Sequence, residues 1–309
     1  MVSTNELDNE MSLQDIDKAC KDFGVLYYLP TLISSPIDTI LQAIKAVREF
    51  KKSHPGSGLL GMHLEGPFLN PIKKGAHSAQ VIHNPTDDEL ALIVEKGRDI
   101  IKIMTIAPEC FTDPQIRYLL DNKIQLYAGH SNMSYEKAMH YFDMGIDMVT
   151  HLYNAMSAFT HRAPGFMGAA LERTDIWAPI ILDGHHLHYG AARIAQRLKP
   201  EHLLLITDST FLGRKIDQFI WGDFDASMIN GTYVNKEGNL AGAAISMIEA
   251  MQNAKNELQI SEQTAIEMAT SRPARAIKMQ DKIGYIRPGY PARFCIFDEG
   301  FKNMETLIL

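Results

Sequence analysis

The sequence contains only three cysteines, Cys20, Cys110 and Cys295, and they lie far apart with no CxxC spacing. This argues against a disulfide framework and against a structural zinc knot, because both need paired or closely spaced cysteines. Such sparse cysteine usage fits the reducing cytoplasm, which is the compartment that we expect for this protein.

Long apolar runs are missing as well. No stretch approaches the about 18 consecutive apolar residues that a membrane-spanning helix needs. The first 20 residues are polar and acidic, so they lack the basic and apolar regions of a secretory signal peptide. We therefore expect a soluble protein with no membrane partner.

Positive charge is also scarce. The 30 Lys and Arg residues are outnumbered by 37 Asp and Glu, the formal net charge is -7, and the basic residues form no stripe. This pattern gives no support for a nucleic-acid partner. Apolar residues, in contrast, make up 46% of the 309 positions, which is enough for a sizeable core.

Strand-like and helix-like segments alternate along most of the chain. Short apolar runs typical of buried parallel strands are followed by capped helices, one of them opened by the capping box of Thr86 and Glu89. The strands of seven such steps end near Leu32, Glu65, Ala107, Ala128, His151, Asp183 and Asp208. This pattern predicts an α/β fold of the (β/α)8 TIM-like barrel type with one strand missing, rather than an open doubly wound sheet.

After Asp208 the pattern changes. We expect turns and short strands over 217–238, helices over 243–257 and 261–279, and strands over 283–289 and 294–297. The last two strands would belong to a small β piece. We therefore expect a barrel domain at residues 1–280 and the C-terminal strands of a small β domain at 281–309.

Polar residues stand at four of the expected strand ends, namely Glu65, His130, His151 and Asp208. In a barrel these ends meet at one rim. One Glu and two His form a three-ligand set that leaves a fourth position for water, as in a catalytic zinc site, and Asp208 would then be the base. Each residue alone is more simply a structural histidine or a helix-capping aspartate. Their agreement at four strand ends favours the metal site.

Two nearby features have plainer interpretations. His63 lies two residues before Glu65 and so shares its inward face, where packing below the rim is favoured over a role as a further ligand. Lys73 and Lys74 are expected in a solvated loop, with contact to an anionic substrate as the alternative.

At these residues the sequence resembles the N-acetylglucosamine-6-phosphate deacetylases of the amidohydrolase superfamily. The matching stretches follow the order of the family from Tyr28 to the C-terminus, and together they are highly specific. They are His63–Phe68, Lys73–His77, Ala128–Asn132, Thr150–Met156, Asp183–His186, Thr207–Asp208 and Leu240–Gly242.

The resemblance implies hydrolysis of N-acetylglucosamine 6-phosphate to glucosamine 6-phosphate and acetate, in amino-sugar catabolism. Glu65, His130 and His151 would hold one divalent metal, zinc first, with iron, cobalt or manganese as alternatives. Asp208 would take a proton from the attacking water and deliver it to the leaving amine. His186 would polarise the acetamide carbonyl.

The resemblance also implies a set of residues that bind the sugar phosphate. They are Ala76, His77, Asn154, Ala155, Arg162, Asp183, Gly184, His185, His186, Leu240, Ala241 and Gly242. The planar guanidinium of Arg162 suits a phosphate, because it meets two oxygens at once. In relatives part of the phosphate contact comes from the neighbouring subunit, so a homodimer is implied.

One departure from the family pattern is large. In the family, half of a small β-sandwich and a first barrel strand precede the point at which Met1 begins, so a second metal held by that strand is not supported. We expect the chain to be less stable than a version with about 50 to 80 further N-terminal residues. Two alternatives stay open, namely another amidohydrolase activity such as that of a cyclic amidase, and a non-catalytic fragment with an incomplete metal site.

Overall fold

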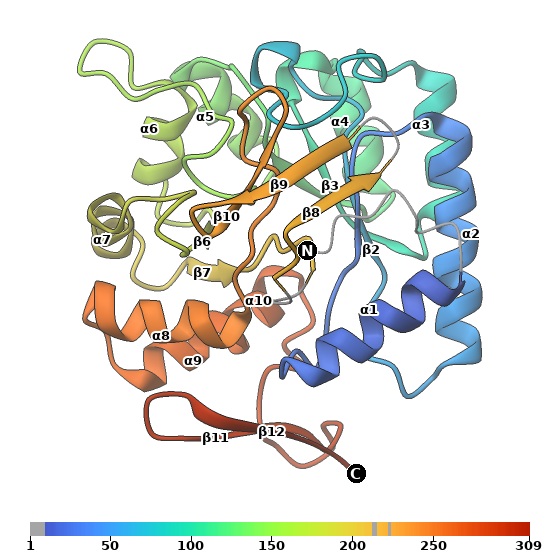
Figure 1. The fold of residues 1–309 in the computed structure, drawn as a ribbon. Helices are drawn as coiled ribbons and strands as arrows, with labels where there is room; N and C mark the ends of the chain where they lie inside the picture. Colours follow the sequence, from blue (N-terminus) through green and yellow to red (C-terminus); the bar gives the residue numbers. More distant parts are fainter. Residues whose placement is uncertain (1–9, 212–214, 222–223) are drawn as a thin grey trace.

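The computed structural model describes residues 10–211, 215–221 and 224–309 (Figure 1). The first nine residues, which belong to the segment that argues against a signal peptide, lie outside the described part. Within that part, no helix is both long enough and apolar enough to cross a membrane.

Seven short strands run in chain order and carry the site. Five form one parallel sheet, each paired to the next along the chain: β1 (Thr31–Leu32), β2 (Met62–Glu65), β3 (Ile101–Ile106), β4 (Gln125–Ala128) and β5 (Met148–Val149). Two more form a parallel pair, β6 (Ala178–Ile181) and β7 (Leu203–Ile206). A parallel bridge between Met148 and Trp177 joins the pair to the sheet. All seven strand positions expected from the sequence are confirmed.

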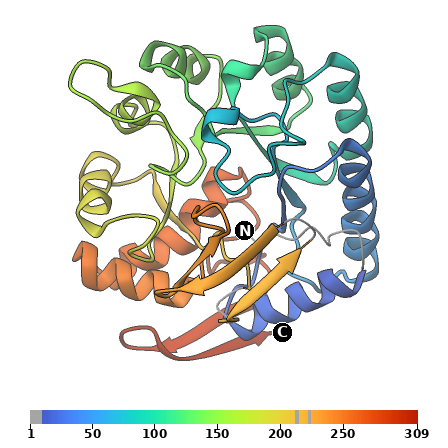
Figure 2. The same ribbon diagram turned by 45° about the horizontal axis from the view of Figure 1, so that its top comes forward.

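Helices surround these strands as an outer ring (Figure 2). They are α1 (Glu10–Asp22), α2 (Ile37–Ser53), α3 (Asp87–Gly97), α4 (Asp113–Asp121), α5 (Tyr135–Asp143), α6 (Gly165–Glu172), α7 (Tyr189–Leu198), α8 (Met247–Leu258) and α9 (Glu262–Ala269). Helix α10 (Ser271–Ala276) lies inside this ring. The capping box of Thr86 and Glu89 opens α3 as expected. Short 3-10 helices, η1 (Pro71–Lys73) and η2 (Pro108–Cys110), follow β2 and β3.

Side chains alternate along the strands between two cores, as a strand period of two requires. On β7, Leu203 and Leu205 pack in the large outer core under the helices, whereas Leu204 packs in a smaller inner cluster with Trp177 and Tyr127. This alternation is that of a barrel with a filled interior, and the predicted fold class is confirmed. Among the described residues, β1 and β7 share no ladder.

The segment after β7 forms two small antiparallel units. The first is a three-stranded sheet of β8 (Gln218–Trp221), β9 (Phe224–Ile229) and β10 (Thr232–Asn235), which matches the short strands expected over 217–238. It packs through Phe219 and Tyr233 on Ala241 and Ala76. The second is a hairpin of β11 (Arg293–Asp298) and β12 (Lys302–Ile308).

Four expectations about local structure need correction. The strand expected over 283–289 is wrong, because this segment forms turns with Gly284 and Gly289 in left-handed conformations, at φ of +88° and +86°. The helix expected over 243–257 begins only at Met247, capped by Ser246. The helix expected over 261–279 breaks at Thr270 into α9 and α10. Helix α6 has no counterpart among the expected elements, because the apolar residues of its segment show no clear helical period.

Candidate active site

Four polar residues occupy the carboxyl ends of the barrel strands. Glu65 is the last residue of β2, and His130, His151 and Asp208 each stand two residues beyond β4, β5 and β7. These three adopt left-handed backbone conformations, with φ of 50°, 22° and 47°. Such conformations are uncommon for residues with a side chain and concentrate at functional sites. Each one turns a side chain from the end of a strand onto the rim.

Three of these side chains converge on one point. The Nε2 atoms of His130 and His151 lie 3.3 Å and 3.4 Å from Glu65 Oε1 and 3.1 Å from each other. All three residues are buried, with exposed fractions of 4% to 5%. Two ligands of a tetrahedral zinc ion stand about 3.3 to 3.4 Å apart, because a zinc–nitrogen bond is about 2.0 to 2.1 Å long. The spacing therefore fits one small cation shared by the three atoms.

The charge state of Glu65 agrees with such a role. Burial raises the pKa of this carboxyl group, but the imidazoles of His130 and His151 outweigh burial and hold the pKa well below its ordinary value. Glu65 Oε1 is fully buried and accepts no hydrogen bond from the described residues. A buried carboxylate oxygen without a donor needs a positive partner, and a cation would provide one.

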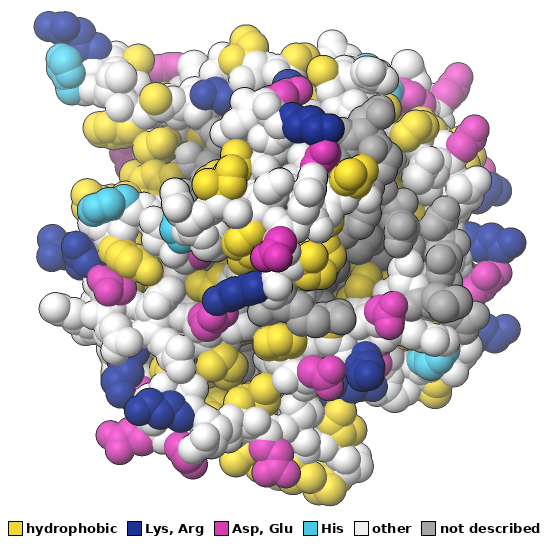
Figure 3. All heavy atoms as spheres, viewed as in Figure 1, with side chains coloured by type: hydrophobic (Ala, Val, Ile, Leu, Met, Phe, Trp, Pro, Cys, Tyr) yellow, Lys and Arg dark blue, Asp and Glu magenta, His cyan; other side chains and the backbone are white. Residues whose placement is uncertain are grey.

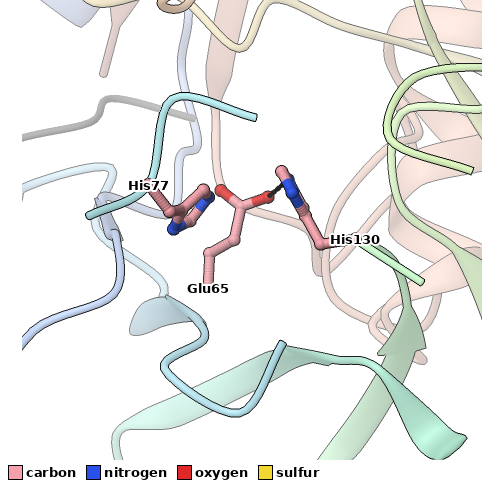
Figure 4. Close-up of side chains that lie close together, drawn as sticks. All are labelled: Glu65, His77 and His130. Carbon is pink, nitrogen blue, oxygen red and sulfur yellow. Dashed lines mark ion pairs between the residues drawn. The ribbon is translucent and has the colours of Figure 1, made fainter. Parts of the chain in front are cut away.

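A second triad of possible ligands combines Glu65 and His130 with His77 in place of His151 (Figure 4). The hydrogen bonds of the rings decide between the two triads. His130 Nδ1 lies 2.8 Å from the carbonyl oxygen of Lys73, which can only accept, so Nε2 of the neutral ring keeps its lone pair for a metal. His77 Nδ1 instead accepts from the backbone N–H of Ser34 at 3.2 Å.

His77 is consequently a hydrogen-bond donor. With Nδ1 accepting, the proton of the neutral ring is on Nε2. Burial, and then the neighbouring His130, lower the pKa of His77 to about 3, so the ring stays neutral near pH 7. The structure thus offers His77 as an N–H donor to an oxygen in the cavity, and Glu65, His130 and His151 as the better ligand set.

His63 has a packing role, which agrees with the favoured interpretation. Its Nδ1 lies 3.0 Å from the hydroxyl of Thr31 and its Nε2 lies 2.8 Å from that of Thr105. Burial lowers the pKa of this histidine to about 4, so the ring is neutral. Both nitrogens are engaged, and neither is left for a metal.

His186 is held by a carboxylate from its own loop. Asp183 Oδ2 lies 2.7 Å from His186 Nδ1, while Oδ1 accepts from the backbone N–H groups of His185 and His186 at 2.9 Å and 2.8 Å. Burial raises the pKa of Asp183, but His186 more than offsets it and the pKa is lowered. Asp183 therefore fixes the orientation of the His186 ring, which lines the cavity beside the candidate metal ligands.

A cavity of about 230 Å³ opens beside these groups. The expected site residues that line it are Glu65, Ala76, His77, His130, Asn154, Ala155, His151, His186, Asp208, Leu240, Ala241 and Gly242. Four expected substrate-binding residues do not line it: Arg162, Asp183, Gly184 and His185. Asp183 contacts His186 Nδ1 through Oδ2 without lining the cavity itself. Arg162 lies on an exposed loop.

Three residues that line the cavity are not among the expected site residues. They are Ile33, Gly75 and Asn239. Gly75 lies within the matching stretch Lys73–His77 and Asn239 directly precedes the stretch Leu240–Gly242, so these stretches could have identified both residues. Ile33 follows β1 and carries no chemical signal in the sequence.

A second hollow, of about 370 Å³, lies at the opposite ends of the strands. It is lined by Arg98, Asp99, Asp121, Asn122 and Lys123, which precede β3 and β4. Because it contains no histidine and faces away from the rim, it is not the site.

A model of the amidohydrolase family matches residues 2–307. The chain belongs to the amidohydrolase family. This amidohydrolase is 34% identical to the N-acetylglucosamine-6-phosphate deacetylase of Haemophilus influenzae, over 92% of the chain and 75% of that relative. It is 31% identical to the N-acetylgalactosamine-6-phosphate deacetylase of Escherichia coli O157:H7, over 92% of the chain and 76% of that relative. It therefore spans about three-quarters of the length of both relatives.

Solved structures agree with the family. The N-acetylglucosamine-6-phosphate deacetylase of Pasteurella multocida superimposes with a TM-score of 0.93 at 33% identity, covering 98% of this chain and 80% of that one. The enzyme of the same name from Thermotoga maritima gives a TM-score of 0.89 at 27% identity, with 97% and 82% covered. The resemblance stated from the sequence motifs is confirmed, and metal dependence is general to the family.

Proposed function

We propose that this amidohydrolase removes the acetyl group of N-acetylglucosamine 6-phosphate, giving glucosamine 6-phosphate and acetate. The observation that carries the proposal is the convergence of Glu65, His130 and His151 to within 3.1 to 3.4 Å at the rim of the barrel. The similarity to deacetylases of this name over most of the chain supports the choice of substrate.

Glu65, His130 and His151 would hold one divalent cation, for which zinc is our first choice, with iron, cobalt and manganese as alternatives. When bound, such a cation supplies a Lewis acid and lowers the pKa of a coordinated water. The two imidazoles and one carboxylate are ligands that zinc accepts, and they leave one tetrahedral position open. The carbonyl oxygen of Lys73 would keep His130 in the ligating tautomer.

Asp208 and His186 would carry the proton chemistry. Asp208 takes a proton as the oxygen of water attacks the acetyl carbon, and it returns the proton to nitrogen as the C–N bond breaks. The leaving group departs as the amine, and the acetyl group departs as acetate. His186, paired with Asp183, donates from Nε2 to the carbonyl oxygen on which negative charge develops.

The remaining cavity residues would hold the sugar phosphate. His77 donates from Nε2, and Asn154, the backbone of Ala155 and the segment Leu240–Gly242 line the rest of the pocket. Gly242 allows a close approach, because a Cβ there would stand 2.3 Å from Thr210 Oγ1 and its φ is +79°. The missing side chain thus lets this wall pack closely against the loop after β7 that carries Asp208 and Thr210.

Arg162 would act on a second copy of the chain in a homodimer. It lies on an exposed loop that projects from the body between β5 and α6 (Figure 1) and is absent from the lining of its own cavity. Thr160 and Ala163 close the loop with a backbone hydrogen bond of 3.0 Å, so the tip is pre-formed. Mixing the inactive variants Arg162→Ala and Asp208→Asn should restore activity in mixed dimers, and no recovery would contradict the dimer.

The N-acetylgalactosamine epimer is the second candidate substrate. Relatives named for it are 31% and 33% identical to this chain. Comparing kcat/KM for the two 6-phosphorylated sugars and for unphosphorylated N-acetylglucosamine decides the matter. We expect the glucosamine derivative to lead, the unphosphorylated sugar to be poor, and a cyclic amide to be inert. Equal rates with and without the phosphate would favour the alternative of a cyclic amidase.

Three further points complete the proposal, namely the location of the enzyme, the class of its partners and its domain division. We place the enzyme in the cytoplasm, where its phosphorylated substrate would be produced and retained, and we assign it no nucleic-acid partner. Figure 3 shows Lys and Arg side chains interspersed with Asp and Glu on the visible face.

We keep the division at residue 280, because the β11–β12 hairpin follows it as a unit of its own. Metal analysis of the purified chain tests the fragment alternative, which predicts no bound metal.

A further inference from the structure

One short segment connects the candidate metal ligands to the wall of the cavity. Lys73 ends η1, and its carbonyl oxygen lies 2.8 Å from His130 Nδ1. Gly75 lies against the same ring, since a Cβ there would stand 3.3 Å from His130 Cε1. Gly75, Ala76 and His77 then line the cavity. The position of segment 73–77 therefore decides both the orientation of the His130 ring and the place of one cavity wall.

This segment is tied to a turn that is distant in sequence. Lys74 Nζ forms an ion pair of 2.6 Å with Glu237 Oε2. Asn239 Nδ2 donates to the carbonyl of Gly75 at 3.3 Å and to Glu237 Oε2 at 3.2 Å. The turn itself is fixed, because the backbone N–H groups of Glu237 and Asn239 both donate to Asn235 Oδ1, at 3.0 Å and 2.9 Å. We call Lys74, Glu237 and Asn239 the clasp.

The clasp joins two walls of one cavity. Asn239 lines the cavity itself, and Leu240, Ala241 and Gly242 directly after it do so as well. Two side-chain contacts thus link the wall at 75–77 to the wall at 239–242, namely Lys74 with Glu237 and Asn239 with the Gly75 carbonyl. Lys74 and Glu237 have side-chain exposures of 25% and 62%. An ion pair that is this exposed adds little to the free energy of unfolding of the whole protein. Its effect on the position of segment 73–77 is therefore local.

We propose that the clasp is a positioning device for His130. By holding segment 73–77 in place, it keeps the Lys73 carbonyl on Nδ1 of His130, and so it keeps Nε2 directed at Glu65 and His151. Lys74, Glu237 and Asn239 touch neither the cation position nor His130, and they act only through the backbone between Lys73 and Gly75. The inference rests on the metal site proposed above. Loss of a group that orients a metal ligand typically lowers metal affinity about 10- to 100-fold.

Charge reversal tests the clasp without relying on turnover. Zinc affinity would be measured by competition with a chelator for wild type, for Lys74→Glu and Glu237→Lys, and for the double variant that restores the pair in reverse. We expect each single variant to bind zinc about 10-fold more weakly and the double variant to recover most of this loss. The visible spectrum of the cobalt-loaded proteins should shift in the single variants and return in the double variant.

A matched pair away from the cavity is the control. Lys278 and Asp147 form an ion pair of 2.9 Å between distant parts of the chain, before β5. Reversal of this pair should leave zinc affinity unchanged. Glu237→Gln, which removes the charge but keeps the shape, replaces the reversal variants if these fail to fold, with the same 10-fold loss expected.

The outcomes separate this inference from the metal site. If wild type binds zinc and the single variants bind it equally well, the clasp has no positioning role. If the double variant stays as weak as the single variants, the ion pair is not the cause of the loss, and the inference is also wrong. If wild type itself binds no zinc or cobalt, the metal site and the clasp both fail.

Discussion

The rim and the interior of this barrel are built from the same strands, but the rim contains buried ionisable side chains whereas the interior is apolar. At the rim, Glu65, His130 and His151 are buried ionisable groups, and two of them have left-handed backbones. Below the rim, the inner cluster is apolar and includes Leu204 and Trp177. The rim holds conformations that cost about 1 to 3 kcal/mol each, and only a well-packed interior can maintain them.

His63 and Thr105 lie at the boundary between these two regions. His63 shares the inward face of β2 with Glu65 two residues on, yet its nitrogens bind threonine hydroxyls rather than a candidate metal position. A distance of two residues along β2 therefore separates a candidate ligand, Glu65, from a packing residue, His63. The difference lies in what the neighbouring strands present at each level, which the sequence of β2 alone does not contain.

The largest effect is expected from neutralising the rim. Glu65→Gln keeps the size of the side chain but removes the charge that two imidazoles surround at 3.3 and 3.4 Å. We expect the purified variant to lose its bound metal and its turnover to fall to background, while the fold persists. Metal content by elemental analysis and circular dichroism measure both. A variant that retains one equivalent of metal would show that Glu65 is not a ligand.

Asp208→Asn should lower turnover but leave the metal content unchanged. The amide cannot accept the proton of the attacking water, so we expect kcat to fall about 100- to 10,000-fold. Because Asp208 is not in the proposed ligand set, metal content should stay at the wild-type level. Near-normal turnover would show that another residue is the base. Loss of the metal would show that the ligand set is different from the one proposed.

Truncation of a buried leucine in the interior should lower the stability of the fold but leave metal binding unchanged. Leu204 and Leu205 are buried on opposite faces of β7, in the inner and outer cores. We expect Leu204→Ala and Leu205→Ala each to lower the free energy of unfolding by about 2 to 5 kcal/mol, measured in urea, while zinc affinity is kept. If Leu204→Ala alone also weakens zinc binding, the rim and the interior are not separable in the way described above.

The sequence predicts those structural features whose signal lies within a few neighbouring residues. The seven strands and the α3 capping box are predictable, because short apolar runs and caps carry their signal within a few residues. Helix α6 is not, since its residues Gly165–Glu172 show no clear helical period and no side-chain cap. The segment 283–289 contains the strand-favouring residues Ile283, Tyr285 and Ile286, but the chain turns at Gly284 and Gly289, which have positive φ.

The same distinction holds at the site. The four strand-end residues are predictable, because their position directly after a buried strand is enough to place them at the rim of a barrel. Our proposal of His151 rather than His77 as a ligand depends on Ser34, which donates to His77 from another loop. The pairing of Lys74 with Glu237 joins residues 163 positions apart and leaves no local signal. Tertiary contacts of this kind cannot be inferred from spacing.

The smallest expected effect lies at a buried lysine, Lys199, which follows α7 and precedes β7. Lys199, only 1% exposed, donates from Nζ to the carbonyl of Ile176 at 2.7 Å and to that of Arg173. Burial lowers its pKa to about 8, from an ordinary value of 10.5. Between these values the unfolded chain binds more protons than the folded one, so this group makes the protein more stable as the pH rises from 8 to 10.5.

Lys199→Met removes that contribution. The variant should be less stable at every pH, because two carbonyl oxygens lose their donor, and its free energy of unfolding should rise less steeply above pH 8 than that of wild type. Urea titrations at intervals from pH 7 to pH 10 measure the two slopes. Lys45→Met, at a lysine with 74% side-chain exposure, is the control and should keep the wild-type slope. Parallel slopes for wild type and Lys199→Met would mean that Lys199 keeps its proton in the folded state, and that its two carbonyl partners outweigh its burial.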